Sequence, residues 1–141
     1  MQDIIEFTNQ NIWLVTGLVA SGLAVIFFEL RLKARDIGSL STSLAVSAIN
    51  NGTAVIDVRP AEQFATGHIV DARNILAADL DAAKEPLTKN KKGTVLVCEN
   101  GASSAECAAR LRKQGIDNVF SLKGGVQAWQ QENLPIVSKS S

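Results

Sequence analysis

The sequence of 141 residues predicts an α/β domain, in which a parallel sheet is flanked by helices, preceded by one transmembrane helix. Two observations lead to this prediction. A long uncharged apolar stretch lies near the N-terminus, and beyond it short β-branched runs alternate with helical patterns. The remaining length of about 100 residues suits a single compact domain.

The apolar stretch has the length and composition of a membrane span. No charged residue lies between Glu6 and Glu29, and 13 of the 17 residues at 12–28 are apolar. A helix of about 20 residues spans roughly 30 Å, the hydrocarbon thickness of a bilayer. Trp13 lies near one end, where an indole is stable among lipid headgroups. We therefore expect a transmembrane helix at residues 11–30, in contact with membrane lipid.

Two other interpretations of this stretch are less consistent with the sequence. A buried core helix is usually shorter and carries a polar stripe. A cleaved signal peptide begins with positive charge, whereas residues 1–10 contain only Asp3 and Glu6 as charged residues. Gly17 and Ser21 have the spacing at which small residues pack a second membrane helix, which would provide a surface for a membrane-protein partner.

The charges that follow the span predict its orientation. Arg31, Lys33 and Arg35 lie in a basic linker at residues 31–38. Positive residues flank the cytoplasmic ends of membrane helices, so we expect a cytoplasmic C-terminal domain. The short N-terminus, residues 1–10, is then external.

Short runs with polar or glycine flanks predict the strands of the domain, because buried parallel strands have this composition. They lie at residues 53–57, 73–75, 94–98 and 118–122. Helices are expected between and around them, at residues 41–49, 60–64, 103–114 and 124–132. Ser41 or Ser43 suits the first N-cap, Pro60 the first turn of the second helix, and Gly115 the end of the third. Pro135 prevents the last helix from continuing.

Two further segments and the overall composition complete the description of the domain, which we place at residues 39–137. The basic run around Pro86 predicts a solvated surface loop, and residues 138–141 form a polar tail. With 14 basic and 14 acidic residues, the chain lacks the positive charge of a nucleic-acid-binding protein. Two cysteines are too few for a disulfide scaffold, and with a single His they argue against a metal site. No cofactor is expected.

Cys98 is the candidate nucleophile because it ends a predicted strand in front of a helix. In open α/β sheets, binding sites form beyond the carboxyl ends of the strands. Backbone N–H groups and the positive end of the helix dipole favour the thiolate, the nucleophilic form, and Gly101 allows the tight turn that this requires. The same loop would hold the outer sulfur of a persulfide or an anion. The alternative is a small buried cysteine that merely ends a strand.

Five segments in a fixed order are similar to a rhodanese domain and together cover roughly residues 40–137. They are Val55-Ile-Asp-Val-Arg59, Glu62-Gln-Phe-Ala-Thr-Gly-His-Ile69, Asp71-Ala-Arg-Asn-Ile75, Val95-Leu-Val-Cys98 and Gly115-Ile-Asp-Asn-Val-Phe-Ser-Leu-Lys-Gly-Gly-Val-Gln-Ala-Trp129. A single span ahead of one such domain resembles the bacterial membrane-anchored proteins called YibN-like. The resemblance implies a rhodanese-like fold and a location in the bacterial inner membrane.

The resemblance also implies a sulfurtransferase activity. Cys98 would take sulfur from a sulfane sulfur donor as a persulfide and pass it to a thiol or other nucleophile acceptor. Asp57 and Arg59 stand where the family braces its active loop. The backbone of that loop would bind the sulfur through residues Glu99, Asn100, Gly101, Ala102 and Ser103.

The loop departs from the pattern of thiosulfate-using members, which usually read Cys-Arg-x-Gly-x-Arg-Ser. Glu99 and Ser103 replace the two basic residues here. A carboxylate about 5 Å from the thiolate repels an approaching anion by about 3 kcal/mol at an effective dielectric of about 20. We therefore expect weak turnover of thiosulfate, a dianion. The alternative function is a non-enzymatic rhodanese-fold interaction module tethered to the inner membrane.

The remaining candidate residues have structural interpretations. Cysteine-dependent phosphatases need Cys-x5-Arg, and Ser104 occupies the arginine position, so phosphatase activity is excluded. His68 lies in a Gly-His-Ile turn typical of the family. Cys107 is expected to be a small core residue, and Trp129 to anchor the last helix in the core.

Overall fold

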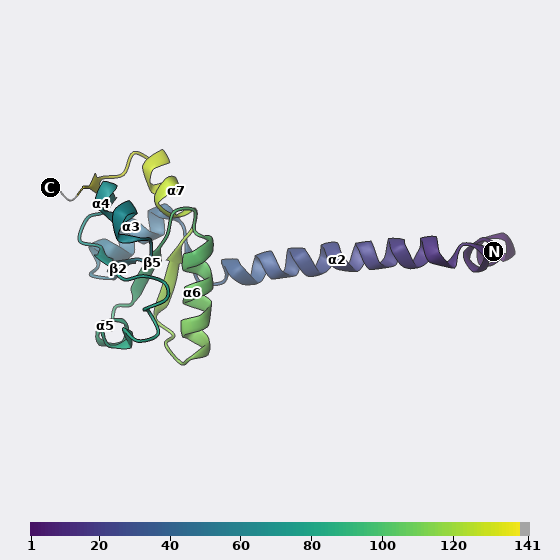
Figure 1. Ribbon diagram of the computed structural model, residues 1–141, viewed down its shortest axis with the longest axis horizontal. Coiled ribbons are helices and arrows are strands. Elements are labelled where there is room, and N and C mark those ends of the chain that lie inside the picture. Colours follow the sequence, from purple (N-terminus) through teal and green to yellow (C-terminus); the bar gives the residue numbers. More distant parts are fainter. Residues whose placement is uncertain (139–141) are drawn as a thin grey trace. The chain divides into compact units, whose positions relative to one another are not determined.

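The structure is a computed structural model that describes residues 1–138, apart from the side chain of Arg35, so most of the predicted polar tail lies outside the described residues. The chain forms two compact units, Met1–Ala34 and Arg35–Ser141 (Figure 1). Because the second unit contains both hydrophobic core clusters, it has the interior of an independent domain.

The N-terminal unit consists of two helices, α1 (Gln2–Gln10) and most of α2 (Ile12–Asp36). The 23 residues Ile12–Ala34 form one helix that is long and apolar enough to cross a membrane, and no part of it is buried. Residues 31–36, expected in the basic linker, continue α2 as helix. The helix of α1 was not predicted, because residues 1–10 were treated only as a short terminal segment.

The domain contains the predicted parallel sheet, which confirms the α/β class. Its five strands are all parallel and lie in the order β1 (Ser39–Leu40), β6 (Val119–Leu122), β5 (Thr94–Val97), β2 (Ala54–Asp57) and β4 (Arg73–Asn74). The middle strand is β5. The edge strand β1 was not predicted, and neither was a separate antiparallel pair formed by β3 (His68–Ile69) and β7 (Ile136–Val137).

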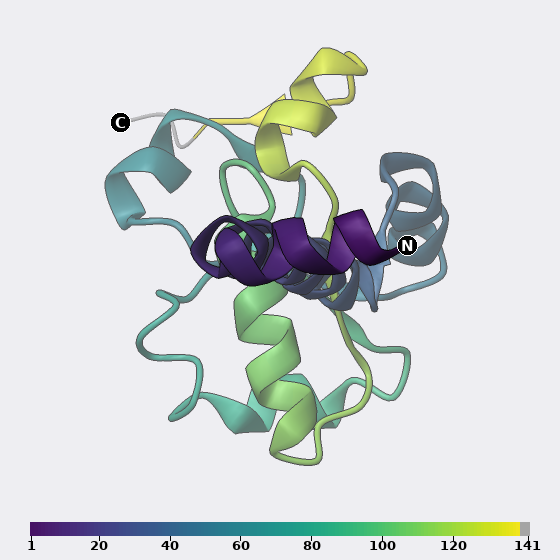
Figure 2. The same ribbon diagram turned by 90° about the vertical axis from the view of Figure 1, so that its right-hand side faces the viewer.

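Helices cover both faces of the sheet (Figures 1 and 2). Four of them match predicted helices to within a few residues, and they are α3 (Thr42–Asn50), α4 (Ala61–Thr66), α6 (Ala102–Lys113) and α7 (Gly125–Gln131). The hydroxyl of Ser41 caps α3 by accepting a hydrogen bond from the backbone N–H of Leu44 at 3.4 Å. The predicted surface loop around Pro86 is instead a short exposed helix, α5 (Lys84–Lys89), fixed by the buried Leu87.

The alternation of side chains along β5 divides the core into two clusters. Val95 and Val97 pack on the face that α3 and α7 cover, together with Trp129. Leu96 and Cys98 point to the opposite face and pack with Leu111 of α6. Successive residues of a strand point to opposite faces, so the period of β5 directs the Cys98 side chain toward α6.

Candidate functional site

The site is the loop that connects β5 to α6, beyond the carboxyl end of the middle strand of the sheet. Cys98 follows β5 directly, and Gly101 is the N-cap of α6. Gly101 has φ +89°, in the left-handed region that glycine adopts without strain. A Cβ atom at this position would lie 2.8 Å from the backbone nitrogen of Gly124. The loop therefore needs glycine here both for its turn and for its packing.

The sulfur of Cys98 lies among donors from the start of α6. Its Sγ accepts hydrogen bonds from the backbone N–H groups of Gly101 at 3.0 Å and Ser104 at 3.3 Å. The Ser104 hydroxyl, which is fully buried, lies 3.3 Å from Sγ. Backbone N–H groups and the helix N-terminus stabilise negative charge, so this geometry suits a thiolate or persulfide at Cys98.

Other loop residues shape the turn instead of contacting the sulfur closely. The Asn100 side-chain oxygen accepts a hydrogen bond from the backbone N–H of Ala102 at 3.0 Å and lies 4.0 Å from Sγ. Ala102 and Ser103 are exposed in the first turn of α6. The structure thus brings Ser104 to the sulfur more directly than Ser103, the residue that the sequence predicted.

The start of α7 holds the loop from its other side. The backbone N–H of Val126 donates to the Cys98 carbonyl at 2.9 Å, and that of Gln127 donates to the Glu99 carbonyl at 3.1 Å. Gly125 has φ +60°, and a Cβ atom there would overlap the Cys98 carbonyl oxygen. Glycine at this position therefore allows α7 to approach the active loop closely enough for these hydrogen bonds.

Arg59 connects the end of β2 to the active loop. Its Nη2 donates to Asp57 at 2.8 Å and to the Gly67 carbonyl at 2.7 Å, while Nη1 donates to Glu99 at 3.0 Å. Desolvation by burial opposes the charged form of Arg59. The hydrogen bonds and charges of Asp57 and Glu99 outweigh that effect and raise its pKa. Asp57 and Arg59 therefore connect the end of β2 to the active loop through side-chain hydrogen bonds.

The ion pair with Arg59 alters the electrostatic environment expected for the loop. The prediction treated Glu99 as an unpaired carboxylate beside the sulfur. In the structure its charge is partly neutralised, although its side chain remains 49% exposed. The two residues are 40 positions apart in the sequence, so their pairing depends on the tertiary fold.

Two residues of the site were missing from the predicted set, Ser104 and Gly125. Ser104 was recognisable as the last residue of the family's Cys-x-x-Gly-x-x-Ser pattern. Gly125 belongs to the Gly124-Gly125 pair, which predicted the start of the last helix but gave no signal of a contact with the active loop.

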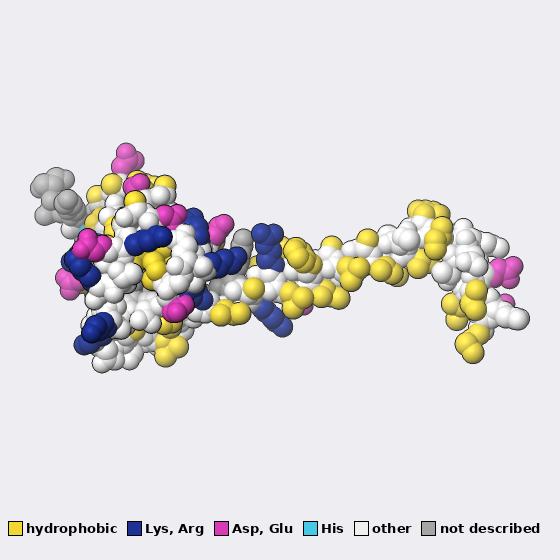
Figure 3. Space-filling model, turned by 90° about the horizontal axis from the view of Figure 1, so that it is seen from below, with side chains coloured by type: hydrophobic (Ala, Val, Ile, Leu, Met, Phe, Trp, Pro, Cys, Tyr) yellow, Lys and Arg dark blue, Asp and Glu magenta, His cyan; other side chains and the backbone are white. Residues whose placement is uncertain are grey.

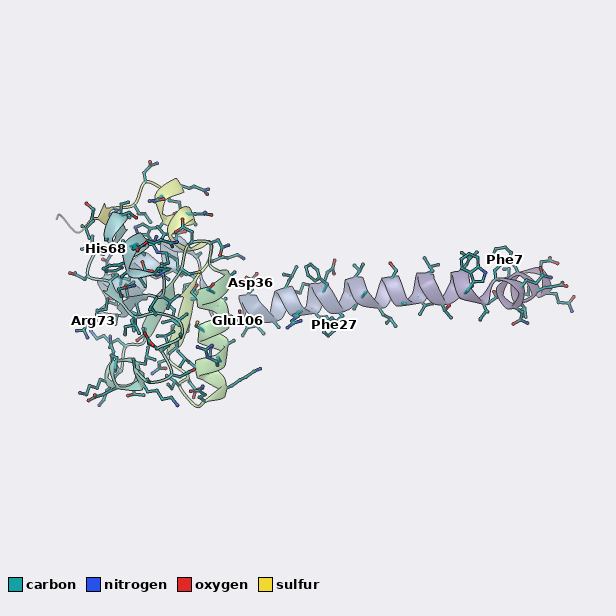
Figure 4. The ribbon with its side chains drawn as sticks, in the orientation of Figure 1. Phe7, Phe27, Asp36, His68, Arg73 and Glu106 are labelled. Atoms are coloured by element: carbon teal, nitrogen blue, oxygen red, sulfur yellow. The ribbon has the colours of Figure 1, made fainter. Side chains whose placement is uncertain are left out.

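The other candidate residues have structural contacts. His68 stacks on Phe64 with ring centroids 3.7 Å apart, and its Nδ1 lies 2.7 Å from the Phe64 carbonyl. Figure 4 shows His68 on a different side of the domain from Glu106 of α6. Trp129 is buried, and its Nε1 donates to the Pro135 carbonyl at 3.0 Å. Within residues 1–138, no group of three His, Cys, Asp or Glu side chains is placed to hold a metal ion.

Comparisons with known proteins agree with this geometry. The profile of the rhodanese-like domain family matches residues 41–132. The protein YibN of Escherichia coli is 32% identical over 140 residues, which cover 97% of this chain and 98% of YibN. The thiosulfate sulfurtransferase GlpE of Pseudomonas aeruginosa is 40% identical over 89 residues, which cover 57% of this chain and 72% of GlpE.

Solved structures show the same fold. A rhodanese-related protein from Thermoplasma volcanium superposes with a TM-score of 0.63 at 27% identity, covering 70% of this chain and 96% of that protein. The order of the five sequence segments, the parallel sheet and the profile match all lead to one assignment. The chain belongs to the rhodanese-like domain family.

Proposed function

We propose that this protein is a membrane-anchored sulfurtransferase that carries sulfane sulfur as a persulfide on Cys98. The observation that carries the proposal is the position of Sγ, which accepts N–H groups of Gly101 and Ser104 at 3.0 and 3.3 Å. The similarity to a thiosulfate sulfurtransferase of Pseudomonas aeruginosa supports the same reaction class.

The first step is nucleophilic attack by the Cys98 thiolate on the sulfane sulfur of the donor. A new S–S bond forms at Sγ, the donor's bond to that sulfur breaks, and the leaving group departs with the electron pair. With thiosulfate the leaving group is sulfite. The protein now carries a persulfide anion, and the total negative charge is the same before and after the step.

The second step returns the enzyme to its starting state. A thiolate or other nucleophile of the acceptor attacks the outer sulfur of the persulfide, and Cys98 leaves as thiolate. The backbone N–H groups of Gly101 and Ser104 stabilise the negative charge in both steps because they already point toward the sulfur.

The charges around the loop favour a donor other than free thiosulfate. Arg59 directs its guanidinium to Asp57, Gly67 and Glu99, so it is engaged within the protein. Glu99 places a half-exposed carboxylate in the loop. A low-molecular-weight or protein-bound persulfide, which carries less negative charge than thiosulfate, therefore suits this site better.

Intact-mass analysis tests the reaction. The purified protein is incubated with thiosulfate and, separately, with a low-molecular-weight persulfide. A gain of one sulfur atom that Cys98→Ser abolishes and Cys107→Ser retains is the expected result. If neither donor adds sulfur, the protein is instead a rhodanese-fold interaction module, and Cys98 has only a structural role.

We also propose that α2 anchors the domain in the bacterial inner membrane, with the N-terminus outside and the domain in the cytoplasm. The supporting observations are the apolar helix Ile12–Ala34 and the positive charges of Arg31 and Lys33 at its C-terminal end. Protease added to spheroplasts, whose inner membrane is accessible from outside, is expected to leave the domain intact. Degradation of the domain under these conditions would contradict the proposed orientation.

A further inference from the structure

The N-terminal helix α1 is amphipathic, and none of its residues is buried. At 100° per residue, Met1, Ile4, Ile5 and Phe7 fall on one side. Their exposed fractions are 98%, 70%, 62% and 61%. Thr8 is the one polar residue on this side, and its hydroxyl donates to the Ile4 carbonyl at 2.7 Å. The opposite side is polar throughout and consists of Gln2, Asp3, Glu6, Asn9 and Gln10. Figure 3 shows hydrophobic side chains on α1 as well as along α2.

The boundary between α1 and α2 is a defined structure at Asn11. Its backbone N–H and its side-chain Nδ2 both donate to the Phe7 carbonyl, at 3.0 and 3.1 Å, which satisfies the end of α1. Its own carbonyl accepts the N–H groups of Leu14 and Val15, at 3.0 and 3.2 Å, which starts α2. Asn11 has φ −123° and ψ 37°, outside the helical region. The sequence therefore separates two helices instead of extending one.

Two alternative locations for α1 conflict with its side chains. As a continuation of the membrane span, it would place Asp3 and Glu6 in hydrocarbon, where carboxylates are unstable. As a helix in bulk water, it would expose its apolar side, and nine residues are too few for a stable isolated helix. The interface of a bilayer accommodates both sides of such a helix.

We propose that α1 lies in the lipid interface at the N-terminal end of α2, with Ile4 and Phe7 directed toward the acyl chains. The inference rests on the proposed membrane span, because α1 is joined to the apolar helix through Asn11 alone. Trp13, in the first turn of α2, is 69% exposed and marks the same interface. Figure 4 shows Phe7 on α1 and Phe27 farther along the chain, on α2.

The chemistry of α1 also predicts what kind of lipid surface it contacts. Its polar side contains carboxylates and amides but no Lys or Arg. Attraction to anionic headgroups therefore does not contribute, and the contact depends on the burial of apolar side chains. Binding to a zwitterionic bilayer should be as complete as binding to an anionic one.

A quenching scan of the full chain tests this arrangement. Single cysteines, Asp3→Cys, Ile4→Cys, Glu6→Cys and Phe7→Cys, are introduced with Cys98→Ser and Cys107→Ser, labelled with a fluorophore and reconstituted in phosphatidylcholine vesicles. Iodide is expected to quench labels at positions 3 and 6 several-fold more strongly than labels at positions 4 and 7. Adding phosphatidylglycerol to the vesicles should leave this pattern unchanged.

The outcomes distinguish α1 from the membrane span. Equal quenching at all four positions, or equal protection, would overturn the interfacial helix. Protection that disappears when the protein is diluted in lipid would overturn it in favour of packing against a second copy. A label at Leu18→Cys reports on the span separately. If that label is protected while the pattern in α1 is absent, the span stands and only the interfacial helix is overturned. If that label is quenched, the proposed span itself is wrong.

Discussion

Arg59 and Glu99 form an ion pair that joins the end of the second strand to the active loop, with 3.0 Å between Nη1 and Oε2. The partners differ in exposure, because Arg59 is 6% exposed and Glu99 49% exposed. The same guanidinium neutralises Asp57, which is 1% exposed. The buried guanidinium of Arg59 thus pairs with two carboxylates. Asp57 lies in the interior, and Glu99 lies in the loop that carries Cys98.

The Asp57 carboxylate makes Arg59 the most sensitive position of this network. In Arg59→Gln, Asp57 would remain buried without its cation, and the domain should lose about 3–5 kcal/mol of stability. Urea unfolding of residues 35–141 measures this loss. Glu99→Gln is the matched control, since removing a half-exposed partner should cost at most about 1 kcal/mol. Equal losses in the two variants would show that Asp57 does not depend on Arg59.

Glu99→Gln should increase the rate at which thiosulfate adds sulfur to Cys98. Removing a half-exposed carboxylate from the loop should lower the barrier for a dianion by about 1 kcal/mol, which corresponds to about fivefold in rate. An alkyl persulfide, with at most one negative charge, should gain less. Single-turnover mass spectrometry measures both rates, and Glu106→Gln on exposed α6 surface is the control. Equal gains with the two donors would contradict an electrostatic role for Glu99.

The sheet was predictable from the sequence because its main strands are short β-branched runs with clear flanks. Val95 and Leu96, for example, lie in a continuous apolar run, which is typical of a strand that is buried on both faces. In the structure they pack into the two core clusters on opposite faces of the sheet. The antiparallel pair was not predictable, because each strand has two residues and His68 pairs with Val137 far along the chain. Residue patterns specify such short pairings only weakly.

The cysteine and the turn of the active loop were predictable from the sequence, whereas the contacts that other segments make with this loop were not. The position of Cys98 follows from the end of a strand, and the turn follows from Gly101. The pairing of Arg59 with Glu99 and the contact of Gly125 with the Cys98 carbonyl join distant segments. These contacts depend on how β2 and α7 pack against the loop, which no local pattern contains.

Ser104→Ala should slow persulfide formation about tenfold. The Ser104 hydroxyl donates to the Gly101 carbonyl at 3.2 Å while the Cys98 thiol is 3.3 Å from its oxygen. After Cys98 loses its proton, the same hydroxyl can turn to donate to the thiolate, and a hydrogen bond to a charged group contributes about 1.5–3 kcal/mol. Ser103→Ala is the control because Ser103 is exposed. Equal single-turnover rates in the two variants would exclude this role.

Gly125→Ala should disturb the active loop far more than Gly115→Ala. Both glycines have positive φ, at +60° and +90°, so both substitutions introduce backbone strain of about 1 kcal/mol. Only at Gly125 would the new Cβ also overlap the Cys98 carbonyl, whereas the space around Gly115 is open within 4 Å. Urea unfolding and the rate of persulfide formation should therefore both worsen in Gly125→Ala. If the two variants behave alike, α7 does not hold the loop.

Cys107 should make the domain less stable in alkaline solution. Burial raises the pKa of the Cys107 thiol above its ordinary value of 9.0, because desolvation disfavours the thiolate in the core. Below that ordinary value the thiol is protonated in both the folded and unfolded chains, and its contribution to stability is fully present. As the pH rises further, the unfolded chain ionises first, so this contribution is lost as the pH approaches and passes the folded pKa.

Urea unfolding of residues 35–141 at a series of pH values from about 7 to about 10 measures this dependence across the ordinary thiol range. The free energy of unfolding should fall more steeply with pH in the native sequence than in Cys107→Ala. The substitution also removes a buried sulfur from the cluster that contains Leu111, and that loss lowers stability by a similar amount at every pH. The difference in slope therefore isolates the titration of Cys107, since Cys98 is present in both proteins. Parallel curves would show that the thiol does not ionise differently in the folded and unfolded chains.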